Sequence, residues 1–350
     1  MFHSTIIEKP IIIWFLFIEF ATLITSCQNK QSTIDTTLQT KVDSILQNKM
    51  SEIGAISGQA IVMEVQTGEI KAMVGNGISQ ESGLIRTASL LAALETGKVK
   101  LSDTVDVGEG VYMVHDKELL DHNWHRGGYG KLTTLQGLMV NSHIANYKNI
   151  KRAFTEEQAY FDMLNKMSYG QPENIEGLDS LKAAYFVTPN DSGWNNTSLA
   201  WFCIGYNQRI SPIQMLTFYN AIANNGKMVK PTLYKGKTEI INPQIASKAN
   251  IDSLQMSLVK VVTEGLGKPA QSEKVQVAGV SGGSQISTDE DNSEGRVNTI
   301  YSVEYCGYFP AENPKYSIIV SINKVGLPAS GNLMAGSVFK EIVDYIEANK

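Results

Sequence analysis

The segments with the character of β-strands lie at the two ends of this chain, and this separation constrains the fold most. Short runs rich in β-branched residues occupy 59–65 and 69–74, joined by a glycine-containing turn. Comparable runs return only at 275–278, 299–309 and 316–323. Between the two groups, apolar residues recur at helical spacing. Strands grouped at the ends with helices between them predict an α+β fold with one sheet.

The helical segments complete this arrangement. Residues 84–94 carry apolar side chains at helical spacing, and Gly97 suits the end of that helix. We expect an antiparallel five-stranded sheet flanked by terminal helices, with an all-helical lobe inserted between strands two and three. The expected domain spans 51–350, with a sheet lobe at about 51–84 and 270–350 and a helical lobe at about 85–269.

The N-terminus has the pattern of an export signal. Residues 11–26 form an apolar run of the length of a signal-peptide core, interrupted by Glu19. The run ends in Ile-Thr-Ser-Cys at Cys27, which resembles the bacterial lipobox. We therefore expect a lipoprotein signal peptide at 1–26, acylation of Cys27, and a polar tether over 27–50. Within the tether, Leu38, Val42, Ile45 and Leu46 indicate a short helix. The alternative is an uncleaved signal anchor; in both cases the body is exported to the cell envelope and held at the membrane.

Charge and cysteine content narrow the classes of partner and the redox chemistry. The net charge of −5 and the lack of any Lys/Arg-rich block argue against nucleic-acid binding and against an electrostatic membrane surface. Outside the cytoplasm, Cys203 and Cys306 could form a disulfide, or they could remain unpaired as small buried apolar residues. The sequence leaves both possibilities open.

Three stretches carry a resemblance to a known family. They are 127–130 (Gly-Gly-Tyr-Gly), 211–231, which begins Ser-Pro-Ile-Gln, and 306–316, which begins Cys-Gly-Tyr-Phe-Pro. From about Gly58 to the C-terminus the chain resembles the transpeptidase domain of penicillin-binding proteins, most nearly the division-type peptidoglycan transpeptidases. The resemblance implies the fold shared with serine β-lactamases, a peptidoglycan stem peptide or muropeptide as ligand, envelope or division proteins as partners, and no cofactor.

The resemblance also implies where catalytic groups should stand. Such enzymes use the motifs S-x-x-K, S-x-N and K-[TS]-G. The first Ser attacks the peptide carbonyl and becomes acylated, while neighbouring Lys and Ser side chains move protons. The lysine and hydroxyl of K-[TS]-G hold the substrate carboxylate.

The first two motifs are altered in this chain. Counting back from the Ala-Ala-Leu-Glu that follows S-x-x-K in the family, Gly83 takes the nucleophile position and Arg86 the lysine position. Glycine has no side chain to attack with, and arginine stays protonated and cannot act as a base. The second motif falls on residues 141–143, with Asn141 in place of Ser and His143 in place of Asn.

The third motif is altered as well. It falls on residues 280–282, where the apolar Val280 replaces the cation that would hold a carboxylate. No catalytic motif is therefore intact. The polar and small residues that remain are candidates for lining a cleft or binding a ligand, and His143 is of interest because imidazole ordinarily titrates near neutrality. These candidates are Ser82, Arg86, Ser142, His143, Ser281 and Gly282.

A relocated nucleophile is the main alternative to an inactive homologue. The candidates are Ser82, Ser142 and Ser281. For Ser82, a shift of the motif by one residue puts Ile85 in the lysine position, so no base is supplied. Two further S-x-x-K matches, Ser321 to Lys324 and Ser337 to Lys340, are expected to be structural. The first falls in a predicted strand, where residues three apart face opposite sides, and the second falls in the terminal helix.

No metal site is expected. His122 and His125 flank a tryptophan, but a His-x-x-His pair without a carboxylate or cysteine partner is weak evidence for a metal. The sequence therefore predicts an envelope lipoprotein of penicillin-binding transpeptidase type, acting by binding or scaffolding in a peptidoglycan or cell-division context. The alternative is an active transpeptidase, carboxypeptidase or other serine acyl-transferase with a relocated nucleophile.

Overall fold

A computed structural model describes residues 30–75, 77, 79–286 and 299–350. The predicted signal peptide at 1–26 and the predicted lipidation site at Cys27 lie outside these residues. All helices and strands below belong to one compact unit, Thr33–Lys350. Within the described part of the chain, no helix combines the length and apolar character needed to cross a membrane.

The helices are α2 (Thr36–Ile53), α3 (Ile85–Glu95), α4 (Thr134–Met139), α5 (His143–Ala153), α6 (Glu157–Lys166), α7 (Ser198–Phe202), α8 (Pro212–Ala223), α9 (Lys248–Thr263) and α10 (Ala335–Ala348), with single 3-10 turns at η1 (Trp124–Arg126) and η2 (Lys268–Ala270). The strands are β1 (Ala55–Glu64), β2 (Ile70–Val74), β3 (Thr104–Gly108), β4 (Val111–Val114), β5 (Lys117–Leu120), β6 (Gly130–Thr133), β7 (Tyr185–Phe186), β8 (Gln208–Arg209), β9 (Met228–Val229), β10 (Ile240–Asn242), β11 (Ala278–Ile286), β12 (Ile300–Phe309) and β13 (Tyr316–Val325).

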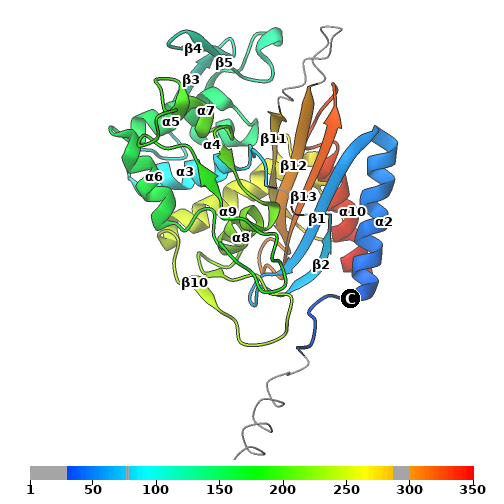
Figure 1. The fold of residues 1–350 in the computed structure, drawn as a ribbon. Helices are drawn as coiled ribbons and strands as arrows, with labels where there is room; N and C mark the ends of the chain where they lie inside the picture. The colour runs from blue at the N-terminus through cyan, green and yellow to red at the C-terminus, as the bar shows by residue number, and fades with distance from the viewer. Residues whose placement is uncertain (1–29, 76, 78, 287–298) are drawn as a thin grey trace, which may run out of the picture. The chain divides into compact units, whose positions relative to one another are not determined.

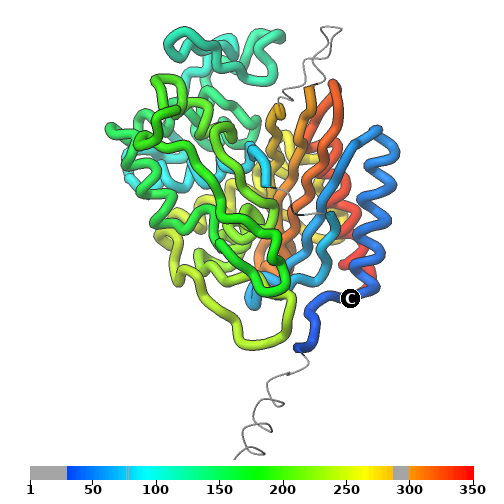
Figure 2. Tube along the Cα trace, in the orientation of Figure 1, coloured from blue at the N-terminus to red at the C-terminus, as the bar shows by residue number. Residues whose placement is uncertain are grey.

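The central sheet confirms the predicted α+β fold. It is five-stranded in the order β11-β12-β13-β1-β2, and every neighbouring pair is antiparallel. Strands from the two ends of the chain therefore pair in one sheet, as expected from their positions in the sequence. The N-terminal α2 and the C-terminal α10 pack on each other beside this sheet (Figures 1 and 2). Helix α8, which belongs to the inserted segment, packs on β13, β12 and β1.

The insertion between β2 and β11 is mainly helical, but it is not all-helical as predicted. It also contains the two-stranded pairs β3-β6, β4-β5, β7-β8 and β9-β10. Glycines make the first of these possible, because a Cβ at Gly128 would lie 2.4 Å from the carbonyl oxygen of Gly108. The Gly-Gly-Tyr-Gly stretch thus permits close packing of backbone at this corner.

The predicted tether is wrong over much of its length, since α2 belongs to the domain. Its N-cap Asp35 accepts a hydrogen bond from Leu38 N at 2.9 Å. Its apolar residues, including Val42 and Leu46, are buried against the sheet. Gly54 ends the helix in the left-handed conformation with φ of 61°. The domain therefore begins at Thr33 rather than at residue 51. The few apolar residues along one side of α2 are enough to pack this helix on the sheet.

The same N-terminal residues cover the free edge of β2. Gln39 donates from Nε2 to Met73 O at 2.8 Å and accepts from Met73 N at 2.7 Å. The hydroxyl of Thr33 donates to Ile70 O at 2.8 Å. Exposed edges invite pairing with other chains, so these contacts protect the sheet on this side.

The stretch 211–231 connects the inserted helices to the sheet, and Glu95 connects two of the inserted helices to each other. Ser211 and Gln214 form a capping box at the start of α8. Asn220 of α8 donates to Val65 O at 3.0 Å and accepts from Ser317 Oγ at 2.7 Å. The carboxylate of Glu95, at the end of α3, caps the start of α9, since it accepts hydrogen bonds from residues 247 and 250.

The structure decides between a disulfide and two unpaired cysteines, which the sequence left open. Cys203 and Cys306 are both buried and both free, so no disulfide joins them. Burial raises the pKa of the Cys203 thiol to about 12. Both residues serve as small buried side chains.

Membership of α2 in the domain predicts that its apolar stripe contributes to stability. Leu46→Ala should lower the free energy of unfolding by about 2–4 kcal/mol, because the leucine is fully buried and leaves a cavity. Ser44→Ala, on the exposed side of the same helix, should change it by less than about 0.5 kcal/mol. Urea unfolding of both variants measures the difference. Equal, small effects would mean that α2 does not pack on the sheet.

Candidate functional site

The three altered motifs meet where the inserted helices approach β11, the edge strand of the sheet (Figure 1). Gly83 and Arg86 lie at the start of α3, and Asn141 lies between α4 and α5. Val280 and Ser281 lie on β11. Direct contacts join these elements, although the residues are up to about 200 positions apart in the chain.

Backbone fills the position that a nucleophile would need. A Cβ placed on Gly83 would lie 2.6 Å from the carbonyl oxygen and 2.8 Å from the nitrogen of Gly283. Real Cβ atoms do not approach backbone so closely, so only glycine fits without a shift of β11. A Cβ on Gly282 would likewise lie 2.8 Å from Leu84 N. The start of α3 and β11 are therefore packed against each other through glycines.

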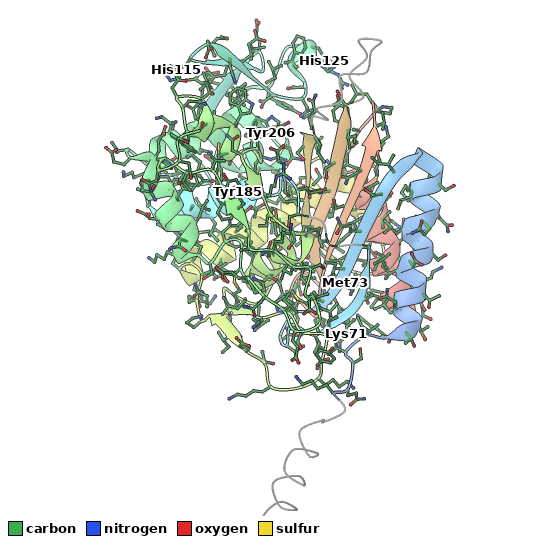
Figure 3. All side chains as sticks on the ribbon, viewed as in Figure 1. Lys71, Met73, His115, His125, Tyr185 and Tyr206 are labelled. Atoms are coloured by element: carbon green, nitrogen blue, oxygen red, sulfur yellow. The ribbon has the colours of Figure 1, made fainter. Side chains whose placement is uncertain are left out.

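Hydrogen bonds hold the same two surfaces together. Asn141 Nδ2 donates to Ser281 Oγ at 2.8 Å, and Ser284 Oγ donates to Glu81 O at 2.9 Å. Gln285 N donates to the hydroxyl of Tyr206 at 3.3 Å, and Tyr206 is labelled between the inserted helices and the sheet in Figure 3. The outer edge of β11 is thus already occupied by the protein itself.

Arg86 occupies the lysine position but makes a different contact. Its side chain is only 6% exposed, and Nη2 donates to Ser281 O at 3.4 Å. Burial lowers the pKa of the guanidinium, while the charges of Tyr219, Glu304 and Asp121 raise it. Arginine remains protonated under these conditions and supplies no base.

Ser82 is paired with a carboxylate that the sequence did not reveal. Its Oγ donates to Oε2 of Glu304, on β12, at 2.6 Å, and both residues are 2% exposed. Burial raises the pKa of Glu304 to about 7, against the hydrogen bonds from Ser82 and Gln80 and the charge of Arg86. The expectation that no base stands beside Ser82 is therefore wrong. In the sequence, the one indication of this Ser–Glu pair is the glutamate inside the apolar run 299–309.

Glu304 belongs to a buried polar cluster on the sheet. Gln80 Nε2 donates to Ser302 Oγ and to Ser321 Oγ, both at 2.7 Å. Asn323 Nδ2 donates to Gln80 Oε1 at 3.3 Å. Ser321, the start of one formal S-x-x-K match, is thus a structural residue of this cluster.

Ser142 serves as a helix cap. Its Oγ accepts from Ala145 N at 3.0 Å, at the start of α5, and donates to Asp121 Oδ2 at 2.7 Å. Asp121 is fully buried, and this burial raises its pKa against the hydrogen bonds that it accepts. Like Ser82, Ser142 is a buried serine paired with a buried carboxylate. Neither hydroxyl is open to a substrate in this conformation.

His143 does not titrate near neutrality, contrary to its expected behaviour. Its Nδ1 lies 3.0 Å from Leu120 O. Burial, together with the charge of Arg86, lowers the pKa of the imidazole to about 3, so the ring is neutral at physiological pH. Val280 is 2% exposed on β11. Its apolar side chain provides no cation at this position.

The remaining motif-like residues have structural partners. Ser337 and Lys340 lie on α10, where Lys340 bonds Asp344 within the same helix. His122 Nε2 lies 3.1 Å from the hydroxyl of Tyr129. His125, labelled at the outer end of the insertion in Figure 3, accepts from Arg126 Nε at 3.1 Å. Among the residues with described positions, no three His, Cys, Asp or Glu side chains form a group that would hold a metal.

The buried Glu304 predicts a specific pH dependence of stability. Its pKa is about 7 in the folded protein and about 4.5 as the ordinary value, so the folded state retains a proton that the unfolded state releases. The free energy of unfolding should therefore fall between about pH 4.5 and pH 7, by about 3 kcal/mol at most. His143, whose folded pKa is depressed, contributes the opposite slope between about pH 3 and pH 6.5.

Glu304→Gln isolates the first effect, because His143 is common to both proteins. The variant should gain stability relative to the wild type as pH rises from 5 to 8, as measured by urea unfolding at several pH values. Glu264→Gln, an exposed position on the surface, serves as the control. A difference between Glu304→Gln and wild type that does not change with pH would contradict the assigned burial.

The packing at Gly83 predicts that restoring a serine there fails. Gly83→Ser should destabilise the protein by roughly 1–3 kcal/mol, since β11 must move to admit the side chain. Gly193→Ser is a matched control, because a Cβ at Gly193 meets no atom within 4 Å. Thermal unfolding of both variants provides the comparison, and equal Tm values would show that space exists beside Gly83.

Comparison with known proteins shows which family this chain resembles. The family model "Penicillin binding protein transpeptidase domain" matches residues 58–344. Penicillin-binding protein PbpB of Mycolicibacterium smegmatis is 23% identical, over 90% of this chain and 54% of that protein. Peptidoglycan D,D-transpeptidase FtsI of Escherichia coli K12 is 22% identical, over 89% of this chain and 54% of that protein. This chain therefore spans about half the length of these relatives.

The fold agrees with solved structures. The transpeptidase domain of penicillin-binding protein 3 from Burkholderia pseudomallei superimposes with a TM-score of 0.79 at 22% identity, over 92% of this chain and 97% of that domain. Since the family model covers most of the chain, the conclusion is direct: this protein belongs to the penicillin-binding protein transpeptidase family.

Proposed function

We propose that this protein is a catalytically inactive transpeptidase homologue of the cell envelope that acts by binding or scaffolding in a peptidoglycan or cell-division context. The observation that carries the proposal is the packing at Gly83, where the backbone of Gly283 occupies the position of a nucleophile. Loss of the nucleophile from a cooperative site costs about a millionfold in turnover. The substitutions at Arg86, Asn141 and Val280 remove the remaining catalytic groups.

The closed edge of β11 bears on the kind of partner. An extended peptide adds to a sheet by hydrogen bonds along a free edge strand. Here Gly83, Asn141 and Tyr206 already contact that edge. Binding of a stem peptide along β11 would require these contacts to separate, so contacts between the outer surface and envelope or division proteins fit the structure better.

Membrane attachment through a lipid on Cys27 forms part of the same proposal. It rests on the Ile-Thr-Ser-Cys pattern at the end of the apolar run. Thr33, where the compact unit begins, is six residues beyond Cys27, so the domain would stand close to the membrane.

One observation favours a second candidate function. Ser82 Oγ lies 2.6 Å from the Glu304 carboxylate, and burial raises the pKa of Glu304 to about 7, into the range of a general base. A serine acyl-transferase that uses this pair would need the 2% exposed hydroxyl to become accessible. Movement of β11 away from α3 would be one way to expose it.

Labelling with a fluorescent penicillin separates the two candidates. We expect no covalent label on the purified domain after denaturing electrophoresis, while an active penicillin-binding transpeptidase domain in the same gel is labelled. Ser82→Ala, Ser142→Ala and Ser281→Ala are prepared in parallel. Labelling of the wild type that disappears in Ser82→Ala would defeat the proposal and establish the relocated nucleophile.

A further inference from the structure

A small cavity lies beside the altered motifs, between α3, α4 and α5. Its volume is about 20 Å³, which is enough for one or two particles of the size of a water molecule. Most of the surface that lines it is apolar, from residues that include Leu90, Leu138 and Ala145, and six polar residues line it as well. The polar residues are Arg86, Thr134, Asn141, Ser142, Asn146 and Asn149.

Arg86 brings an uncompensated charge to this cavity. It is 6% exposed, and its one hydrogen bond to the described part of the chain is the 3.4 Å contact with Ser281 O. It forms no ion pair with a carboxylate among the described residues. Four of its five N–H groups therefore have no protein acceptor there. A buried charge is costly unless a counter-charge and hydrogen bonds compensate it.

The two nearest acidic groups compensate it poorly. Glu304 and Asp121 both act on Arg86 through their charge, but neither lines the cavity. Glu304 accepts from Ser82, and Asp121 accepts from Ser142 and Ile144. Burial raises the pKa of both carboxyl groups, and that of Glu304 to about 7, so Glu304 is only partly ionised at neutral pH.

Asn149 adds donors on a second wall. It is 4% exposed, and its Oδ1 accepts from Thr134 Oγ1 at 3.3 Å. Its Nδ2 has no acceptor within the described residues, although an amide of this kind is normally paired when buried. The cavity thus combines a guanidinium and an amide NH₂ whose hydrogen atoms lack partners.

Asn141 adds no donor to this space. Its Nδ2 donates to Ser281 Oγ, and its Oδ1 is buried without a partner. Arg86 and Asn149 therefore supply the N–H groups on which a ligand here would depend.

We propose that this cavity is a binding site for a monovalent anion of the size of chloride, held by the Arg86 guanidinium and the Asn149 amide. Size argues against a carboxylate ligand, and the unpartnered N–H groups favour an anion over water. The anion would neutralise the arginine that replaced the lysine of the ancestral motif, and so stabilise the contact between α3 and α5. The chloride experiments and the penicillin labelling have independent outcomes, so a failure of one proposal can be told apart from a failure of the other.

Thermal unfolding in matched salts tests the proposal. Sodium gluconate, too large for the cavity, keeps the ionic strength constant while sodium chloride replaces it. The wild type should show a saturable rise in Tm of about 2–4 °C with chloride. Arg86→Gln should lose this rise, and the exposed Arg209→Gln should keep it. A wild-type Tm that is equal in both salts would overturn the proposal.

Asn149→Asp provides a second variant that does not depend on removing the arginine. A carboxylate at this position supplies the negative charge covalently, and its oxygen still accepts from Thr134. The variant should be folded and its Tm should no longer depend on chloride. A chloride-dependent rise as large as that of the wild type would place the anion elsewhere.

Anomalous diffraction from crystals grown in sodium bromide locates the ion directly. An anomalous peak within hydrogen-bond distance of Arg86 and Asn149 is the expected result. Ordinary water density in the cavity without an anomalous signal would overturn the assignment.

Discussion

The contact between the outer edge of β11 and the start of α3 is the interaction on which the rest of the site depends. Gly83 and Gly282 allow two backbones to approach so closely that no side chain fits between them. Once this contact forms, the neighbouring groups are turned inward. Arg86 reaches the carbonyl of Ser281, and Ser82 reaches Glu304. The region where the family performs chemistry becomes an interface between the two lobes.

Electrostatics explain why this interface is not simply a hydrophobic core. Arg86, Glu304 and Asp121 are all buried, and all three have pKa values shifted in the direction of the neutral form by burial. Buried polar groups of this kind contribute little net stability, but each becomes costly when a partner is removed. The hydroxyls of Ser82 and Ser142 serve as those partners. In this structure, both serines therefore act as hydrogen-bond partners of buried carboxyl groups.

The sequence could predict the sheet and the inserted helices, because strand and helix patterns are local properties, and the resemblance to the family implied where the three motifs fall. It could not predict the Ser82 pair, because Glu304 lies 222 residues away and is identified only by its burial. The sequence indicated a short helix at α2 but not that this helix belongs to the domain, because its few apolar residues are diluted by polar ones and their burial depends on the sheet. His143 was misjudged because its pKa depends on surroundings that the sequence does not show.

The closed edge of β11 is tested most directly by NMR-detected hydrogen exchange at the amides of Gly283 and Gln285. Gly283 N faces Gly83, and Gln285 N is bonded to the hydroxyl of Tyr206. If the edge is closed in solution, both amides should exchange as slowly as the amides of the central strand β13. Exchange as fast as that of an unpaired edge strand would show that the cleft is open, and would contradict the account given for this site.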